Sequence, residues 1–345
     1  MTRVEEILEA LNNGEAMNIE PQSDMEEYLL ALINGETDVP EPNTPIEAYF
    51  YHLCQSGMSG GNTGGGSSGG DIDALIDGSI TEITSNVERI RERGISYCKK
   101  LESADFPLLT EITAYAFHHC ELLKFINAPL VSSIGTYAFS YCKKLESADF
   151  PLLTEITNGM FDECHSLVSV NMPQVTTIGT LSFFNCKALK NINIPIVTKI
   201  GTKAFMQSGL VTADFPLVTD LGESAFYESK SLTNVNIPLI TTIKKQLFQY
   251  CSSLSFLDAK LVTNIESNAF SGCKALNTIV LRSETVVTLS STVAFSGTPF
   301  ASGGTGGTVV CKQHLIEQYK IETNWSTLYE GGTITFVALE GSEYE

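Results

Sequence analysis

A repeat of 22 residues runs through the middle of this 345-residue chain and constrains the fold more than any other feature. Prolines recur at steps of 22, 22, 22, 22, 21 and 22 residues, at Pro107, Pro129, Pro151, Pro173, Pro195, Pro216 and Pro238. Phenylalanine follows the same spacing from Phe117 to Phe270, and columns of leucine and isoleucine run beside it. Four columns in register predict a solenoid, because one repeat cannot cover its own apolar face and must bury it against the next.

Each repeat begins with apolar and polar residues in alternation, which predicts a short, half-buried strand. Proline then ends the strand, since proline has no N–H to donate to the sheet. The second half of the repeat brings isoleucine and phenylalanine back to the interior. Parallel strands stack about 4.8 Å apart. We therefore expect an α/β-type repeat solenoid with a parallel sheet of about nine coils.

The ends of the chain differ from this body in charge and pattern. Residues 1–56 contain twelve acidic residues against Arg3 and form three short units with helix-capping boxes and closing glycines. They predict acidic short-helix repeats that anchor or assemble the protein, or else a small self-packed cap. Residues 57–70 are rich in glycine and serine and predict a flexible linker.

The solenoid is expected to occupy residues 71–300, its first coil acting as the N-terminal cap. Residues 301–345 break the repeat and predict a C-terminal α/β cap, with a helix near 312–322 and a strand over 333–339. The single tryptophan, Trp325, is expected to seal the last coil, because a solenoid needs its open ends covered.

The repeat resembles the BspA-like subtype of leucine-rich repeats, L-x-x-I-x-[IF]-P-x-x-V-x-x-I-G-x-x-A-F-x-x-C. The motif is clearest in residues 167–186 and 189–205. The resemblance implies a bacterial or viral surface protein that adheres to host proteins or glycans. Family members commonly carry a signal peptide, whereas the first residues here lack its basic and apolar regions. Residues 1–56 also resemble N-terminal segments of structural and fibre proteins of gut phages, so localisation stays open between a virion, a cell surface and the cytoplasm.

Composition argues against several functions. The net charge of −19 disfavours nucleic acid and anionic membranes as partners, and no apolar stretch reaches the length of a membrane span. Five histidines without metal-like spacing, and the absence of nucleotide-binding or nucleophile motifs, predict a protein that is not an enzyme. We expect no metal and no cofactor.

Seven of the nine cysteines form another column, Cys98, Cys120, Cys142, Cys164, Cys186, Cys251 and Cys273. Ser208 and Ser229 fill the gap in that column. An odd count with serine replacements does not suit a disulfide framework. The column predicts small, buried, reduced thiols that act as weak donors, and folding in a reducing compartment.

The position between the two apolar residues of each strand should face outward, and only Asp and Asn occupy it over eight repeats. The residues are Asp105, Asn127, Asp149, Asn171, Asn193, Asp214, Asn236 and Asp258. No two aspartates are neighbours, which allows an asparagine to donate to an adjacent carboxylate. Phe125 and Phe256 stand in the flanking column. These ten residues are the candidate ligand-binding face, and the alternative is a hydrogen-bonded ladder that only stabilises the sheet.

These patterns lead to two functional hypotheses. The first is a non-catalytic adhesion protein that recognises a host or cell-surface protein or glycan on its sheet face. The second is a structural or fibre-type virion or assembly protein of a phage or prophage, in which the solenoid is a rigid spacer. Residues 1–56 would then serve in self-association or in docking to another partner.

Overall fold

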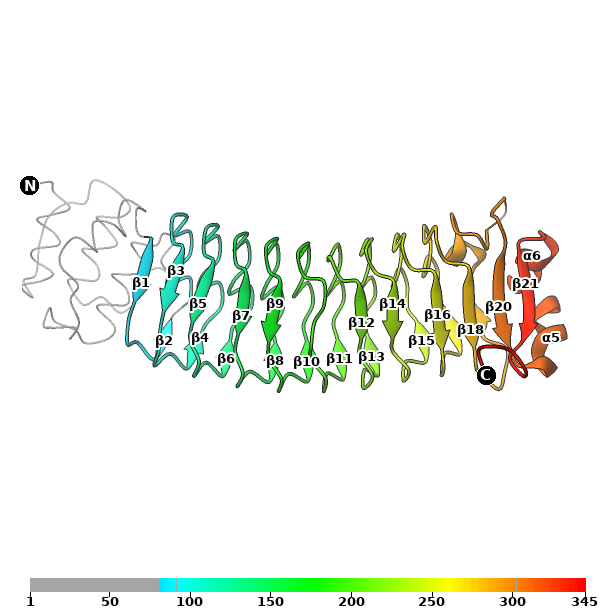
Figure 1. The fold of residues 1–345 in the computed structure, drawn as a ribbon, viewed down its shortest axis with the longest axis horizontal. Helices are drawn as coiled ribbons and strands as arrows, with labels where there is room; N and C mark the ends of the chain where they lie inside the picture. Colours follow the sequence, from blue (N-terminus) through cyan, green and yellow to red (C-terminus); the bar gives the residue numbers. More distant parts are fainter. Residues whose placement is uncertain (1–80, 91, 302) are drawn as a thin grey trace, which may run out of the picture.

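The computed structural model describes residues 81–90, 92–301 and 303–345. Within them the chain winds into an elongated rod whose coils follow the sequence from one end to the other (Figure 1). The expectations for residues 1–56, for the linker 57–70 and for residues 71–80 lie outside the described residues. The repeat solenoid of about nine turns with parallel sheets is confirmed.

Every described coil except one contributes a strand to the main parallel sheet. The bounds are β1 Glu82–Thr84, β3 Ser103–Asp105, β5 Phe125–Asn127, β7 Ser147–Asp149, β9 Ser169–Asn171, β12 Thr212–Asp214, β14 Asn234–Asn236, β16 Phe256–Ala259, β18 Thr278–Leu281, β20 Gly307–Cys311 and β21 Ile334–Ala338. Residues 190–194 occupy the equivalent place between β9 and β12 without forming a strand. Partners lie one repeat apart, as Ser103 and Phe125 do, so every column of the sequence becomes a row along the rod.

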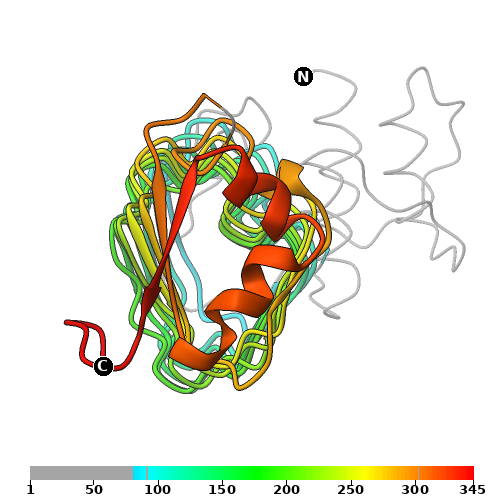
Figure 2. The ribbon, with the colours of Figure 1, turned by 90° about the vertical axis from the view of Figure 1, so that its right-hand side faces the viewer.

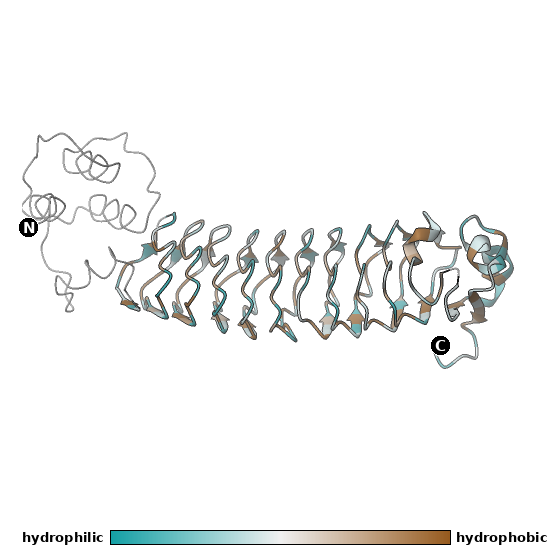
Figure 3. Cartoon of the chain, turned by 90° about the horizontal axis from the view of Figure 1, so that it is seen from above, coloured by the Kyte–Doolittle hydropathy of each residue, from teal (hydrophilic) through white to brown (hydrophobic). Residues whose placement is uncertain are grey.

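A second row of two-residue strands follows the turn after each proline. Its members are β2 Arg89–Ile90, β4 Glu111–Ile112, β6 Ser133–Ile134, β8 Glu155–Ile156, β10 Thr177–Ile178, β11 Lys199–Ile200, β13 Asp220–Leu221, β15 Thr242–Ile243, β17 Asn264–Ile265 and β19 Thr288–Leu289. The second residue of each strand is buried, because the aliphatic column turns inward there. Hydrophobic and hydrophilic segments alternate along the coils in Figure 3.

The interior is a continuous stack of phenylalanine rings. Neighbouring rings from Phe117 to Phe295 have centroids 5.2 to 5.7 Å apart and lie nearly parallel. Offset stacking at this distance is favourable for aromatic side chains. The spacing of the rings is set by the spacing of the coils, so a phenylalanine at the same place in every repeat packs on its own copies.

The cysteine column lies beside this stack and forms no disulfide in the described residues, where every cysteine is free and buried. Each thiol from Cys120 onward donates to a main-chain carbonyl 25 residues earlier, for example Cys164 Sγ to Phe139 O at 3.2 Å. Burial raises the pKa of Cys273 to about 12, so its thiol stays protonated as a donor. The prediction of buried, reduced thiols is confirmed for these residues.

Two elements close the C-terminal end. The short helices η1 Thr292–Phe295 and η2 Gln313–Leu315 lead to α5 Ile316–Ile321 and α6 Trp325–Glu330. In Figure 2, α5 and α6 lie across the open end of the last coil. Trp325 is fully buried there, as expected, and its Nε1 donates to Val287 O at 2.7 Å. The expected strand is β21, whereas α6 was not predicted, because six residues are too few for a recognisable helical period.

Candidate functional site

The outward side of the main sheet carries the Asp/Asn column predicted from the repeat. Within each three-residue strand the middle residue points into the core, so its two neighbours point away from it. Asp105 and Asp258 are half-buried, and the other six members of the column are exposed. The structure thus brings all eight residues into one row, which we call the polar row.

Hydrogen bonds join the polar row in pairs. Asn127 Nδ2 donates to Asp105 Oδ1 at 2.7 Å, and Asn171 Nδ2 donates to Asp149 Oδ1 at 2.8 Å. Asn236 Nδ2 donates to Asp214 Oδ1 at 2.6 Å. In every pair the asparagine belongs to the following coil. The side-chain ladder therefore exists, but as three separate pairs rather than as one chain of bonds.

The two phenylalanines of the candidate face differ in their surroundings. Phe125 on β5 is 50% exposed, between the serines of the neighbouring coils. Phe256 on β16 is 38% exposed and stacks against Tyr344. Asp258 is likewise engaged, because Arg282 Nε donates to both of its carboxylate oxygens, at 2.9 and 3.2 Å. The N-terminal part of the face is open, and its C-terminal part is covered by the chain itself.

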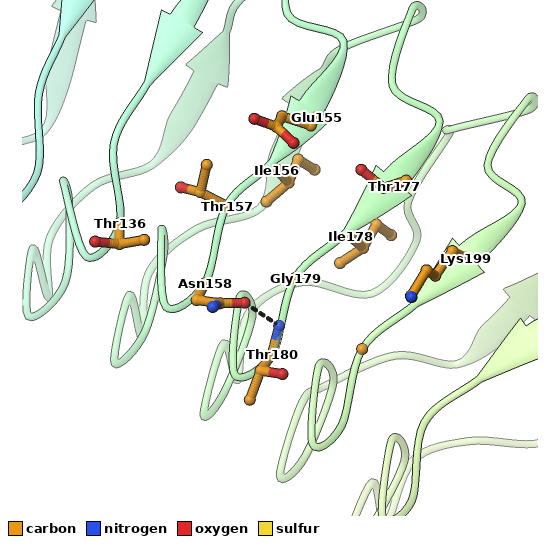
Figure 4. Close-up of a pocket in the computed structure, with 11 residues that line it drawn as sticks. Thr136, Glu155, Ile156, Thr157, Asn158, Thr177, Ile178, Gly179, Thr180 and Lys199 are labelled. Atoms are coloured by element: carbon orange, nitrogen blue, oxygen red, sulfur yellow. Dashed lines mark hydrogen bonds between the residues drawn. The ribbon is translucent and has the colours of Figure 1, made fainter.

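A shallow groove lies on another side of the rod, along the short strands β8, β10 and β11 (Figure 4). Its volume is about 410 Å³, and none of the ten candidate residues lines it. Gly179 and Gly201 form part of its wall, where a Cβ atom would lie within 2.7 Å of the backbone of the preceding coil. Asn158 Oδ1 accepts a hydrogen bond from Thr180 N at 2.8 Å across two coils. The groove follows from the close approach of these coils.

The repeat pattern and this geometry point to one family. The family model for the BspA type leucine rich repeat region matches residues 78–190 and 176–300, in six copies. The chain belongs to the BspA-type leucine-rich repeat family. The resemblance stated from the motif is confirmed for the repeat, while the likeness of residues 1–56 to phage fibre proteins stays a prediction.

Solved leucine-rich repeat structures resemble this BspA-type protein. A protein from Bacteroides ovatus is 19% identical, covering 75% of this chain and 92% of its own, with a TM-score of 0.40. A leucine rich cell surface protein from Faecalibacterium prausnitzii is 24% identical over 63% and 85%, with a TM-score of 0.32. The pneumococcal vaccine antigen PcpA is 14% identical over 75% and 79%, with a TM-score of 0.39. No curated protein matches the chain.

His118 and Asp162 of this BspA-type protein have shifted pKa values, and both residues lie away from the candidate face. Burial, followed by the charges of His119 and Arg93, lowers the pKa of His118 to about 4. Burial, with the charge of Glu163, raises the pKa of Asp162 to about 6. Both shifts follow from partial burial at the turns between coils. The stacked rings of Tyr97, His119 and Tyr141 lie beside His118 and account for the burial of its side chain.

Among the residues that the structure describes, no group of three or more His, Cys, Asp and Glu side chains is arranged to hold a metal ion. Across the same part of the chain, no helix has both the length and the apolar character that a membrane crossing requires.

A second exposed row was not singled out from the sequence. Aliphatic side chains directly after the proline column are exposed at Leu108, Leu130, Leu152, Ile196, Leu217, Leu239 and Leu261. The signal was present, since the position after the proline column is aliphatic in all of the eight repeats from residue 108 to residue 261 except the one with Gln174. The same periodicity, however, also marks buried columns. Only the path of the turn shows that this column faces away from the core.

Proposed function

We propose that this BspA-type protein is a non-catalytic binding protein that recognises a protein or glycan ligand on the outward face of its main sheet. The observation that carries the proposal is the polar row with Phe125 at its open end. Solenoids commonly bind through such an extended sheet surface. The row presents carboxylates and amides in register over eight repeats, at a spacing fixed by the backbone rather than by flexible side chains.

The hydrogen-bonded pairs support binding rather than excluding it. Each paired aspartate accepts through Oδ1, and within the described residues its Oδ2 has no protein partner. Each paired asparagine keeps its carbonyl oxygen and a second N–H. The pairs hold these groups in place, and a ligand that meets prearranged donors and acceptors loses less entropy on binding. Phe125 adds an apolar surface on which a sugar ring or a side chain can stack.

The test is a screen of immobilised glycans and extracellular proteins against the full chain, followed by two variants. Asp149→Ala and Phe125→Ala should each weaken binding of the ligand found by at least about tenfold, equivalent to about 1.4 kcal/mol. Their circular dichroism and thermal unfolding should match those of the parent protein.

Leu130→Ala is the matched control, because Leu130 is 45% exposed in the same coil as Phe125 but lies off the face. Its binding should equal that of the parent protein. Loss of binding with Leu130→Ala, or full binding with both face variants, would reject the sheet face as the site. Hydrolysis of any glycan in the screen would reject the non-catalytic assignment.

A further inference from the structure

The last seven residues, Leu339–Glu345, fold back over the outward face of the main sheet, and we call them the covering segment. Leu339 N donates to Cys311 O at 2.8 Å and directs the chain outward. Leu339 then packs with Val280 and Val310, and Tyr344 packs against the same cluster. Figure 2 shows the end of the chain outside the sheet, beyond β21.

The polar row ends where the covering segment begins. Val280 and Val310 lie in register with Asp258, so apolar side chains replace Asp and Asn at the outward position. Val280 and Val310 are buried in the structure, and without a cover they would lie on the outside of the sheet, so an apolar group placed over them is stabilising. This change in the column explains why the segment lies over β18 and β20 and not farther along the rod.

Tyr344 makes the most specific contacts of the segment. Its ring stacks on Phe256, with centroids 5.7 Å apart and planes 20° from parallel. Arg282 Nη2 donates to the main-chain oxygen of Tyr344 at 2.5 Å, while Nε of the same guanidinium binds Asp258. The guanidinium of Arg282 thus binds the main chain of Tyr344 on one side and the carboxylate of Asp258, a member of the polar row, on the other.

The charge of the segment matches the surface beneath it. The outward position that is proline in seven repeats becomes Lys260 and Arg282 in the coils of β16 and β18. The covering segment in turn carries Glu340, Glu343 and Glu345. Glu343, as a hydrogen-bond partner of the Tyr344 phenol, raises its pKa. The Tyr344 ring of the acidic covering segment therefore stacks on the Phe256 ring, whose coil and its neighbour carry basic side chains.

We propose that the surface formed by Phe256, Val280 and Arg282 is a docking site for a tyrosine-bearing acidic segment of a partner protein. Residues 339–345 occupy it as an internal ligand. This inference rests on the proposed function and names a protein as the ligand class at this end of the face. The internal ligand is replaceable, because Glu340, Gly341 and Glu343 are exposed and only Leu339 and Tyr344 pack on the sheet.

The experiment compares the full chain with a variant that ends at Glu340. The probe is the fluorescein-labelled peptide Gly-Ser-Glu-Tyr-Glu, the sequence of residues 341–345, followed by fluorescence anisotropy. The peptide should bind the shortened chain saturably and the full chain at least about tenfold more weakly. A peptide with Ala in place of Tyr should lose at least about tenfold in affinity for the shortened chain.

Two substitutions in the shortened chain locate the site. Phe256→Ala should abolish binding, and Leu130→Ala should leave it unchanged, because Leu130 is exposed but lies off the face and in a coil far from Tyr344. Trp325 fluorescence and circular dichroism establish that each chain is folded. Should the shortened chain fail to fold, Tyr344→Ala in the full chain opens the same site and takes its place.

Several results would overturn the inference. They are no binding to the opened site, equal binding to open and covered chains, or loss of binding through Leu130→Ala. Light scattering that shows tail-dependent dimers of the full chain would assign the site to a second copy instead of a partner. The screen of the proposed function uses the full chain, in which the covering segment is in place, so failure of the peptide to bind is separable from failure of the proposed function.

Discussion

Cysteine and serine replace one another in a single column because both can donate to the same carbonyl. Cys251 Sγ donates to Phe226 O at 3.0 Å, and Ser229 Oγ donates to Phe205 O at 2.7 Å, one repeat earlier. The sequence shows cysteine and serine in the same column, and it led to the inference that these side chains are weak hydrogen-bond donors. The acceptor was not visible, because it is a main-chain oxygen 24 or 25 residues away that only the coil geometry brings close.

We expect Cys164→Ser and Cys164→Ala to differ in the free energy of unfolding. Serine keeps a donor for Phe139 O and should cost less than about 1 kcal/mol. Alanine removes the donor and leaves a small cavity, and should cost about 1–2 kcal/mol. Urea unfolding followed by circular dichroism measures both. A serine variant less stable than the alanine variant would show that the column requires the apolar character of the thiol and not its donor.

At the scale of the secondary-structure element, the helical cap of α5 and α6 covers the open end of the last repeat. Trp325 packs against Phe295, Tyr319 and Phe336, so one residue joins the solenoid to α5 and β21. The sequence indicated a cap and a sealing tryptophan because the repeat stops near residue 300. It did not indicate α6, whose six residues are helical because of the surface on which they pack.

Substitutions of Trp325 should therefore destabilise the whole chain. Trp325→Phe keeps an apolar ring but leaves Val287 O without its donor, and should cost about 1–2 kcal/mol. Trp325→Ala should cost about 3–5 kcal/mol, because the end of the phenylalanine stack loses its cover. Urea unfolding by circular dichroism gives both values. Ile321→Ala is the control, since Ile321 is 82% exposed in α5, and equal losses in all three variants would argue against a sealing role.

At the scale of the whole molecule, each coil of the repeat from β3 to β16 packs against its neighbours along the rod, so the stability of that part is close to a sum over coils and interfaces. Phe183 lies near the middle of the phenylalanine stack, between Phe161 and Phe205. Loss of its ring weakens two interfaces at once. Coils far from it keep all of their contacts.

Phe183→Ala should lower the free energy of unfolding by about 3–5 kcal/mol. Hydrogen exchange should accelerate in the coils on either side of residue 183, while the strands β16 and β18 keep the protection of the parent protein. Mass spectrometry of peptide fragments measures the pattern along the rod. Uniform loss of protection would mean that the molecule opens as a single cooperative unit.

The repeat by itself determined the coil, the register and which residues of each strand face inward or outward. Because each repeat is displaced from the previous one by the same translation, equivalent residues of neighbouring repeats lie side by side. Phe161 must therefore contact Phe139, and Asn171 must lie beside Asp149. Only the tertiary structure decided the backbone conformation at the turns and the side-chain contacts at the end of the repeat array. Tyr137 and Leu181 take left-handed conformations although neither is glycine, because the turns and coil contacts around them hold the backbone there; Gly159 occupies the same position in the coil between them. Tyr344 reaches Phe256 from 88 positions away, and no periodic pattern predicts a contact that occurs once.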